Sequence, residues 1–309
     1  MTPAAAGGQL RGVMTIGSPP STQNESQVGL GGSEAPLGVF DSGLGGLTVV
    51  HALRAVLPSE HIVYLGDTAR VPYGTRSPET VVRYARGCAS VLSARGIKAL
   101  VVACNTVSAV ALDVLRAELD LPVLGVVLPG ARAAVACAEA LATAGRDAFR
   151  IGVLGTAGTI RSGAYARAVA SFSTRFEVLG EPAPLLVPLV EEGWLDGMVP
   201  ELAVERYVEP LVAAGASSLV LGCTHYPLLK GVIGRVAERI AGWPVPIVDS
   251  AEATASEMAE LMGTGRIRPR IGAGRGRLSL LVTDLPASFD AAARRFLVEA
   301  LPPVEQIDL

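Results

Sequence analysis

Two of the four cysteines stand in similar local sequences, each after a short apolar run and before polar residues. Cys104 lies in Ala99-Leu-Val-Val-Ala-Cys-Asn-Thr106, and Cys223 lies in Ser218-Leu-Val-Leu-Gly-Cys-Thr-His225. A thiol with a pKa of about 8.5 can be tuned towards neutrality by a neighbouring base or a helix N-terminus, and it can then take or give a proton. Two such thiols, facing each other across a small substrate, suit proton transfer at both faces of one carbon.

Other interpretations of these cysteines remain open. A disulfide suits a secreted protein, and the neighbouring sequence offers too few ligands for zinc, with no Cys-x-x-Cys pattern. A single nucleophilic cysteine would leave the other one unexplained, and a cysteine in an apolar strand is usually a small core residue. Cys88 and Cys137 stand in helical patterns and are expected in the core. We therefore expect free thiols and no bound metal.

An internal repeat links the two cysteines. Leu37-Gly-Val-Phe-Asp-Ser42 aligns with Ile151-Gly-Val-Leu-Gly-Thr156, and the two cysteine segments align in the same order at nearly the same spacing. The repeat predicts two similar halves, each with a strand that ends at a cysteine. Because ligands in such sheets bind outside the carboxyl ends of the strands, the repeat places both cysteines across one cleft.

The elements that must hold these residues alternate along the chain. Short apolar runs predict strands, and helical patterns between them predict parallel sheets flanked by helices. Ser77-Pro-Glu79 has the order of an N-cap, a first-turn proline and an acidic residue, and 249–252 resembles a capping box, so a helix should begin at each. The expected strands are 37–40, 61–65, 99–103, 123–127, 150–154, 217–221 and 245–248, with a break at Pro129-Gly130.

These elements predict an α/β protein of two pseudo-symmetric domains with the active site in the cleft between them. Residues 37–128 with 247–309 should form the first domain, and residues 129–246 the second. Residues 1–36 lack apolar periodicity, and their Gly, Ser, Pro and Thr content is typical of disorder.

Composition excludes several classes of protein. Half of the 309 residues are hydrophobic, which is enough for a sizeable core, and the net charge of −3 argues against a nucleic-acid partner. The longest stretch without a charged side chain, 210–229, contains glycine and proline and is better interpreted as helix end, strand and turn than as a membrane span. No signal peptide is visible, so a soluble, cytoplasmic protein is expected.

Several separate motifs, in one order, resemble those of the glutamate racemase family within the aspartate/glutamate racemase superfamily. The resemblance covers nearly everything from Leu37 to about Leu297. Its motifs are Phe40-Asp-Ser-Gly-Leu-Gly-Gly-Leu-Thr48, Gly66-Asp67, Pro72-Tyr-Gly74, Ala103-Cys-Asn-Thr106, Gly155-Thr156 with Thr159, and Leu221-Gly-Cys-Thr-His-Tyr-Pro227. It implies interconversion of L- and D-glutamate without a cofactor, supplying D-glutamate for peptidoglycan.

The resemblance also implies roles for five catalytic residues. Cys104 would deprotonate D-glutamate and Cys223 would deprotonate L-glutamate. Asp41 would hold or accept the Cys104 proton, although capping the following turn is a compatible role. His225 would assist Cys223, and Glu191 matches the family position that assists this histidine, with Glu192 beside it as an alternative.

Hydroxyl, amide and backbone donors at strand ends can bind the two substrate carboxylates without a cation. For each serine or threonine, ordinary helix capping is an equally good explanation. The expected substrate-binding residues are Asp41, Ser42, Pro72, Tyr73, Gly74, Asn105, Thr106, Thr156, Thr159, Thr224 and His225.

No cofactor is expected. Pyridoxal phosphate needs a Schiff-base lysine, and the two lysines, Lys98 and Lys230, are expected before a strand and inside a helix. Glutamate is the expected partner, and a homodimer is the expected assembly. Two alternatives stay open: an aspartate racemase or related isomerase, and a catalytically weak protein that binds a partner such as gyrase.

Overall fold

The computed structural model describes residues 1–2, 32–272 and 274–309. Most of the segment predicted to be disordered, 1–36, lies outside these residues. The prediction of disorder is corrected for the last residues of this segment, because they contact the body of the protein. Lys98 Nζ donates to the carbonyl of Ser33 at 3.0 Å, and Arg270 pairs with Glu34 at 3.0 Å. Ser33 and Glu34 are therefore part of the folded body that includes β1.

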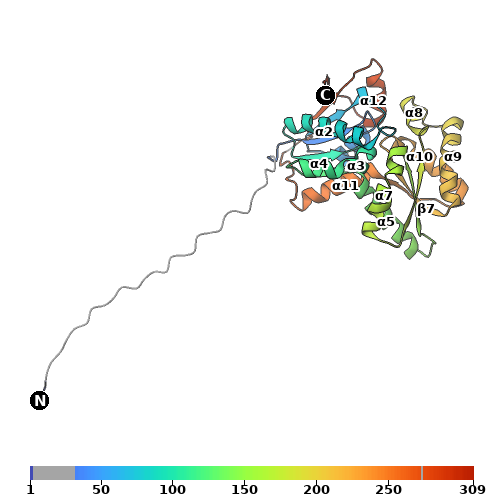
Figure 1. Ribbon diagram of the computed structural model, residues 1–309, viewed down its shortest axis with the longest axis horizontal. Helices are drawn as coiled ribbons and strands as arrows, with labels where there is room; N and C mark the ends of the chain where they lie inside the picture. Colours follow the sequence, from blue (N-terminus) through green and yellow to red (C-terminus); the bar gives the residue numbers. More distant parts are fainter. Residues whose placement is uncertain (3–31, 273) are drawn as a thin grey trace.

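Two parallel sheets form the framework (Figure 1). The first has the order β10-β9-β2-β1-β3-β4, and the second has the order β6-β5-β7-β8. The strands of the first sheet are β1 (Leu37–Asp41), β2 (Ile62–Gly66), β3 (Ala99–Val102), β4 (Val123–Gly125), β9 (Leu278–Val282) and β10 (Val304–Gln306). Those of the second sheet are β5 (Arg150–Gly155), β6 (Glu177–Pro182), β7 (Ala216–Gly222) and β8 (Ile247–Asp249).

The strand orders confirm the internal repeat. The run β2-β1-β3-β4 in the first sheet matches β6-β5-β7-β8 in the second, so β1 corresponds to β5 and β3 to β7. Cys104 follows β3 and Cys223 follows β7, at the carboxyl ends of equivalent strands. The α/β class and the two similar halves are as the sequence predicts.

Helices cover both sheets. We call the first sheet and its helices the first half. Its helices are α1 (Leu47–Val56), the short η1 (Thr68–Arg70), α2 (Pro78–Ala94), α3 (Asn105–Val110), α4 (Leu112–Glu118), α11 (Ser250–Gly263) and α12 (Phe289–Leu297). The second sheet and its helices are the second half. Its helices are α5 (Val127–Thr143), α6 (Ala157–Arg161), α7 (Ala164–Phe172), α8 (Leu186–Glu191), α9 (Met198–Ala213), η2 (Tyr226–Leu229) and α10 (Lys230–Ala241). The helix predicted to begin after Ser77 is confirmed. The Ser77 side chain accepts a hydrogen bond from the backbone N–H of Thr80, and Pro78 is the first residue of the helix.

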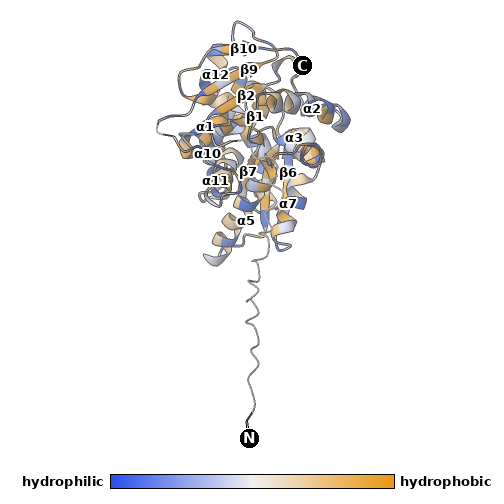
Figure 2. Cartoon of the chain, turned by 90° about the vertical axis from the view of Figure 1, so that its left-hand side faces the viewer, coloured by the Kyte–Doolittle hydropathy of each residue, from blue (hydrophilic) through white to orange (hydrophobic). Residues whose placement is uncertain are grey.

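Buried apolar side chains form three groups, and one of them joins the halves. The first sheet packs against α2, α3 and α4 through residues such as Phe40 and Leu100, and the second packs against α5 and α7 through residues such as Val153. The third group continues from the first sheet, α1, α11 and α12 to the second sheet, α8, α9 and α10. Figure 2 shows these apolar strands inside both halves. Since each large buried side chain contributes roughly 1.5–3 kcal/mol, this shared core holds the halves together.

Several predicted boundaries are wrong. The strand predicted over 123–127 ends at Gly125, and Pro129-Gly130 lies in the first turn of α5, where proline is tolerated because its missing N–H has no helical partner. β8 begins at Ile247 and pairs with β7, so 247–249 belong to the second sheet, whereas the sequence placed them in the first domain.

The predicted capping box at 249–252 forms only in part. Asp249 accepts from the N–H of Ala251 at 2.8 Å, but Glu252 pairs with Lys230 at 2.9 Å. Lys230 itself is the first residue of α10 rather than an interior one.

Candidate active site

A small cavity of about 70 Å³ lies where residues at the strand ends of the two halves meet. Nearly all predicted site residues line it; Asp41 and Thr159 do not. The lining consists of Ser42 and Gly43 after β1, Val71, Pro72, Tyr73 and Gly74 after η1, Cys104, Asn105 and Thr106 after β3, Thr156 after β5, Val187 and Glu191 on α8, and Cys223, Thr224 and His225 after β7. This size suits a small substrate.

Cys104 is the N-cap residue of α3 and is almost fully buried. Its thiol lies 3.6 Å from the Ser42 hydroxyl oxygen, to which it can donate. Burial raises the pKa of Cys104 to about 12, and the negative charge of Asp41 adds to the rise, against hydrogen bonds from the Val107 N–H and Ser42. Cys104 therefore carries its proton at neutral pH, which is the form of a proton donor.

Asp41 lies under the cavity and not on its wall. It is fully buried at the end of β1, and one carboxylate oxygen accepts from the N–H groups of Gly43 and Gly46 at 3.2 and 3.0 Å. Burial raises its pKa, opposed by the charge of His225 and by these backbone groups. Among the described residues its other oxygen has no hydrogen-bond partner. Asp41 does not line the cavity and its carboxylate holds the β1–α1 turn, so its contact with substrate stays a prediction.

The Cys223 side has a relay of three residues. The sulfur of Cys223 lies 3.9 Å from Nδ1 of His225, and Nε2 of His225 lies 3.1 Å from Oε1 of Glu191. Burial alone would lower the pKa of His225, but the hydrogen bonds and negative charges of Cys223 and Glu191 raise it to about 10. His225 is therefore protonated at neutral pH. Of the two adjacent glutamates, Glu191 makes this contact with His225, which favours Glu191 over Glu192 for the predicted role.

The loop after β1 that contains Gly45 and Gly46 packs closely against His225 and Asp41. A Cβ at Gly45 would stand 2.5 Å from Nδ1 of His225, and a Cβ at Gly46 would stand 2.4 Å from the Asp41 Cβ. Only glycine fits at either position without moving a site residue.

Three threonines from the two halves form a hydrogen-bonded cluster. Thr106 Oγ1 lies 2.9 Å from Thr156 Oγ1 and 3.3 Å from Thr159 Oγ1, and the last two are 3.0 Å apart. Thr156 also caps α6, because its hydroxyl accepts from the Thr159 N–H. Thr159 is buried and does not line the cavity, but its hydroxyl contacts those of Thr106 and Thr156, and its role in substrate binding stays a prediction.

Asn105 is held by residues that the sequence did not indicate. Its amide oxygen accepts from the Tyr165 hydroxyl at 2.7 Å, and its amide nitrogen lies 3.5 Å from the Ser250 hydroxyl. Both partners are far away in the chain, and no local pattern marks them.

Asp67 is a second buried carboxylate whose role the sequence did not reveal, although Gly66-Asp67 is one of the motifs. It accepts from Arg70 Nε at 2.6 Å, from Thr283 at 2.9 Å and from the Tyr73 hydroxyl. The hydroxyl of Tyr73 is thus held by Asp67, and the residue is almost fully buried beside the cavity. The next residue, Gly74, accepts through its carbonyl from the Gly158 N–H at 2.9 Å, which ties the loop to the second half.

We expect Tyr73→Phe to lower the free energy of unfolding by about 1–3 kcal/mol, because Asp67 would lose one donor in a buried position. Urea unfolding of the variant and of the wild type measures this. Tyr84→Phe is the matched control, since the Tyr84 ring packs on Tyr73 with centroids 5.4 Å apart. Equal losses in both variants would contradict this role of Asp67.

Neither lysine lines the cavity. Lys98 forms a buried ion pair with Glu60 at 2.6 Å, and Lys230 pairs with Glu252. Within the described ranges, no group of three or more His, Cys, Asp or Glu side chains is arranged to hold a metal ion. In the same part of the chain, no helix is long and apolar enough to span a membrane.

Two thiols that follow equivalent strands and line one cavity suit an enzyme that moves a proton at a carbon centre. The chain belongs to the Asp/Glu/hydantoin racemase family, whose model matches residues 47–258.

The curated relatives are more specific. The chain is 49% identical to the glutamate racemase of Geobacter metallireducens over 88% of its own length and 96% of that protein. It is 44% identical to the glutamate racemase of Neisseria gonorrhoeae over 90% and 98% of the two chains.

Solved structures of similar chains agree with this fold. The glutamate racemase of Thermus thermophilus, in complex with β-chloro-D-alanine, has a TM-score of 0.76 at 44% identity, covering 90% of this chain and 98% of that one. The enzyme of Francisella tularensis, in complex with D-glutamate, has a TM-score of 0.79 at 32% identity, covering 89% and 98%.

Proposed function

We propose that this protein is a glutamate racemase that interconverts L- and D-glutamate by two-base proton transfer without a cofactor, and that it supplies D-glutamate for peptidoglycan synthesis. The observation that carries the proposal is the pair of cysteines. Cys104 and Cys223 follow equivalent strands of the two sheets and line one cavity. The names of the similar proteins support glutamate as the substrate.

In the direction from L- to D-glutamate, Cys223 as thiolate removes the α-proton. Protonated His225, held by Glu191, accompanies the thiolate and balances its charge. Cys104 enters as a thiol, consistent with its raised pKa of about 12, and donates its proton to the opposite face of the carbanion. The reverse reaction exchanges these roles, and the ammonium group of the substrate supplies positive charge that favours the thiolate of Cys104.

The substrate carboxylates bind to polar groups without a cationic side chain. Ser42, Thr106, Thr156 and Thr224 offer hydroxyls to the cavity, and the Tyr73-Gly74 backbone offers N–H groups. Among the residues that line the cavity there is no arginine or lysine. Two carboxylates therefore depend on donors fixed by the surrounding fold.

We also propose a division into two domains, with chain crossings at β4–α5 and β8–α11, which places 37–125 with 250–309 in the first domain. A homodimer in the cytoplasm remains our prediction for the assembly and its location. Aspartate racemisation and partner binding without catalysis are the competing functions; the complete thiol pair with its relay supports catalysis.

Racemisation in deuterium oxide tests the proposal. The purified protein should convert either enantiomer of glutamate, followed by circular dichroism, and should not convert aspartate at a comparable rate. Early in the reaction deuterium should appear in the product enantiomer and not in the remaining substrate, because the donor on the far side carries a solvent proton. No turnover with either enantiomer would overturn the proposal, and early label in the substrate would exclude two separate bases.

A further inference from the structure

The last helix of the first half contacts the relay of the second half. Phe296 on α12 is buried against His225, with ring centroids 5.2 Å apart and the rings nearly perpendicular. The preceding residue, Arg295, donates from Nη1 to the backbone carbonyl of Glu191 at 2.5 Å. One short stretch of α12 therefore touches two of the three relay residues.

The carbonyl of Glu191 needs an outside partner because of how α8 ends. Gly193 has φ +78°, its N–H donates to the carbonyl of Val190, and the N–H of Trp194 donates to that of Leu189. This is a Schellman motif, which satisfies two of the last carbonyls of a helix. Glu191 is the last residue of α8, and its carbonyl is left for Arg295.

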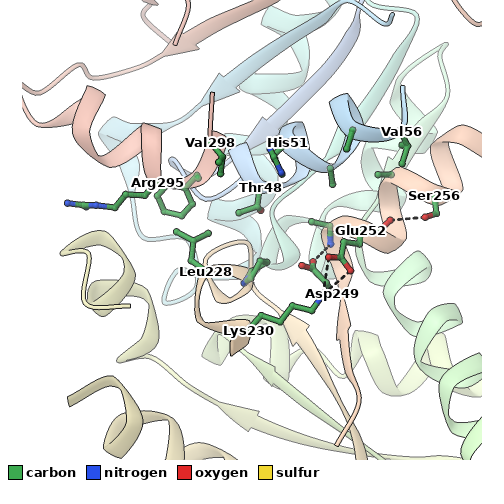
Figure 3. A pocket seen from close by; sticks show the side chains of 16 residues that line it. Thr48, His51, Val56, Leu228, Lys230, Asp249, Glu252, Ser256, Arg295 and Val298 are labelled. Carbon is green, nitrogen blue, oxygen red and sulfur yellow. Dashed lines mark hydrogen bonds and ion pairs between the residues drawn. The ribbon is translucent and has the colours of Figure 1, made fainter. Parts of the chain in front are cut away.

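The path of Arg295 also depends on Gly193. A Cβ at Gly193 would stand 3.0–3.1 Å from the guanidinium group, so the arginine lies flat against the glycine. Figure 3 shows Arg295 extending from α12 away from His51 and Val298, towards the second half. A residue with a side chain at 193 would disturb both the left-handed turn and this contact.

The same C-terminal end of α12, just after Arg295 and Phe296, is fixed to α1 of the first half. His51 Nδ1 lies 3.0 Å from the carbonyl of Leu297, and Arg54 pairs with Glu299 at 2.7 Å. Because α12 is anchored at this end, its contacts with Glu191 and His225 depend on how the two halves sit together.

We propose that Arg295 is a positioning residue for the Cys223 side of the reaction, holding the end of α8 so that the Glu191 carboxylate stays on His225. The inference rests on the proposed racemase function. Glu191 needs this support because its side chain is 50% exposed, whereas that of His225 is 9% exposed. An exposed carboxylate forms a lasting hydrogen bond only where its backbone is fixed.

The test compares Arg295→Ala with Arg294→Ala. Arg294 is the adjacent, exposed arginine of the same helix, so its replacement removes the same charge without the Glu191 contact. We expect kcat to fall roughly tenfold in Arg295→Ala and to stay near the wild-type value in Arg294→Ala. Arg295→Lys, which keeps the charge and a donor, should recover part of the loss and keeps the test usable where alanine prevents folding.

The isotope effect on kcat/KM separates positioning from simple destabilisation. When the Cys223 step becomes slower, the primary effect with α-deuterated L-glutamate should rise, and that with D-glutamate should fall. In a Glu191→Gln background, Arg295→Ala should cause little further loss, because the carboxylate that it positions is already absent.

Two results would overturn the inference: isotope effects that move together for both enantiomers, or losses that multiply fully in the double variant. An inactive wild-type protein would instead refute the proposed function, so the two failures are distinguishable.

Discussion

Replacement of either Cys104 or Cys223 by alanine should abolish racemisation in both directions. Each enantiomer presents its α-proton to one sulfur, and the product must receive a proton from the other. Removing one thiol therefore blocks both the deprotonation of one enantiomer and the formation of that same enantiomer, so neither direction can be completed. Direct proton-transfer groups contribute roughly 10²–10⁴-fold each, and circular dichroism with L- and D-glutamate measures the loss.

Cys137→Ala is the matched control for these variants. It removes a thiol from α5 that does not line the cavity, so activity should be retained. Any exchange of the α-hydrogen with solvent deuterium that survives should be confined to L-glutamate in Cys104→Ala and to D-glutamate in Cys223→Ala. Near-full activity of Cys223→Ala beside an inactive Cys104→Ala would replace this mechanism with a one-base reaction.

His225→Asn should lower activity less than loss of either cysteine, because it removes the partner of Cys223 and not a base itself. L- and D-glutamate have equal free energies, so kcat/KM falls equally in both directions. The asymmetry should appear in the isotope effects, which should rise with α-deuterated L-glutamate and fall with D-glutamate. His61→Asn, which alters a histidine outside the cavity, should leave both unchanged.

The same variant should change how stability depends on pH. The folded-state pKa of His225 is about 10, above the unfolded value of about 6.5. Its stabilisation is therefore complete below about pH 6.5 and is lost as pH rises through 10. The wild type should lose its advantage in free energy of unfolding over His225→Asn across this window, by on the order of 1.4 kcal/mol per pH unit. A constant difference would show that His225 is neutral when folded.

The repeat made the centre of the fold predictable. Aligned apolar runs placed β1 with β5 and β3 with β7, and the two cysteines followed at equivalent strand ends. The predicted break at Pro129 was wrong because proline usually interrupts a helix or strand, although the first turn of a helix also accepts it.

Contacts between distant parts of the chain could not be predicted in the same way. Tyr165 reaches Asn105 from 60 residues away, and Arg295 reaches Glu191 from 104 residues away. Neither pair shares a periodicity or a motif, because the partners are brought together only when helices of different halves pack. The Asp67 contacts with Tyr73 and Thr283 depend in part on β9 lying beside β2.

The order of strands along the chain has a consequence for synthesis on the ribosome. The second sheet is complete once Asp249 has been made, whereas β2 keeps an open edge until β9, at Leu278–Val282, can pair with it. Domains generally fold as units during translation, so the inserted half can form before the half that encloses it in sequence. α12 emerges later still, and with it Phe296 and Arg295. A nascent chain therefore has both thiols before it has the helix that contacts Glu191 and His225, and a prematurely terminated one never acquires that helix.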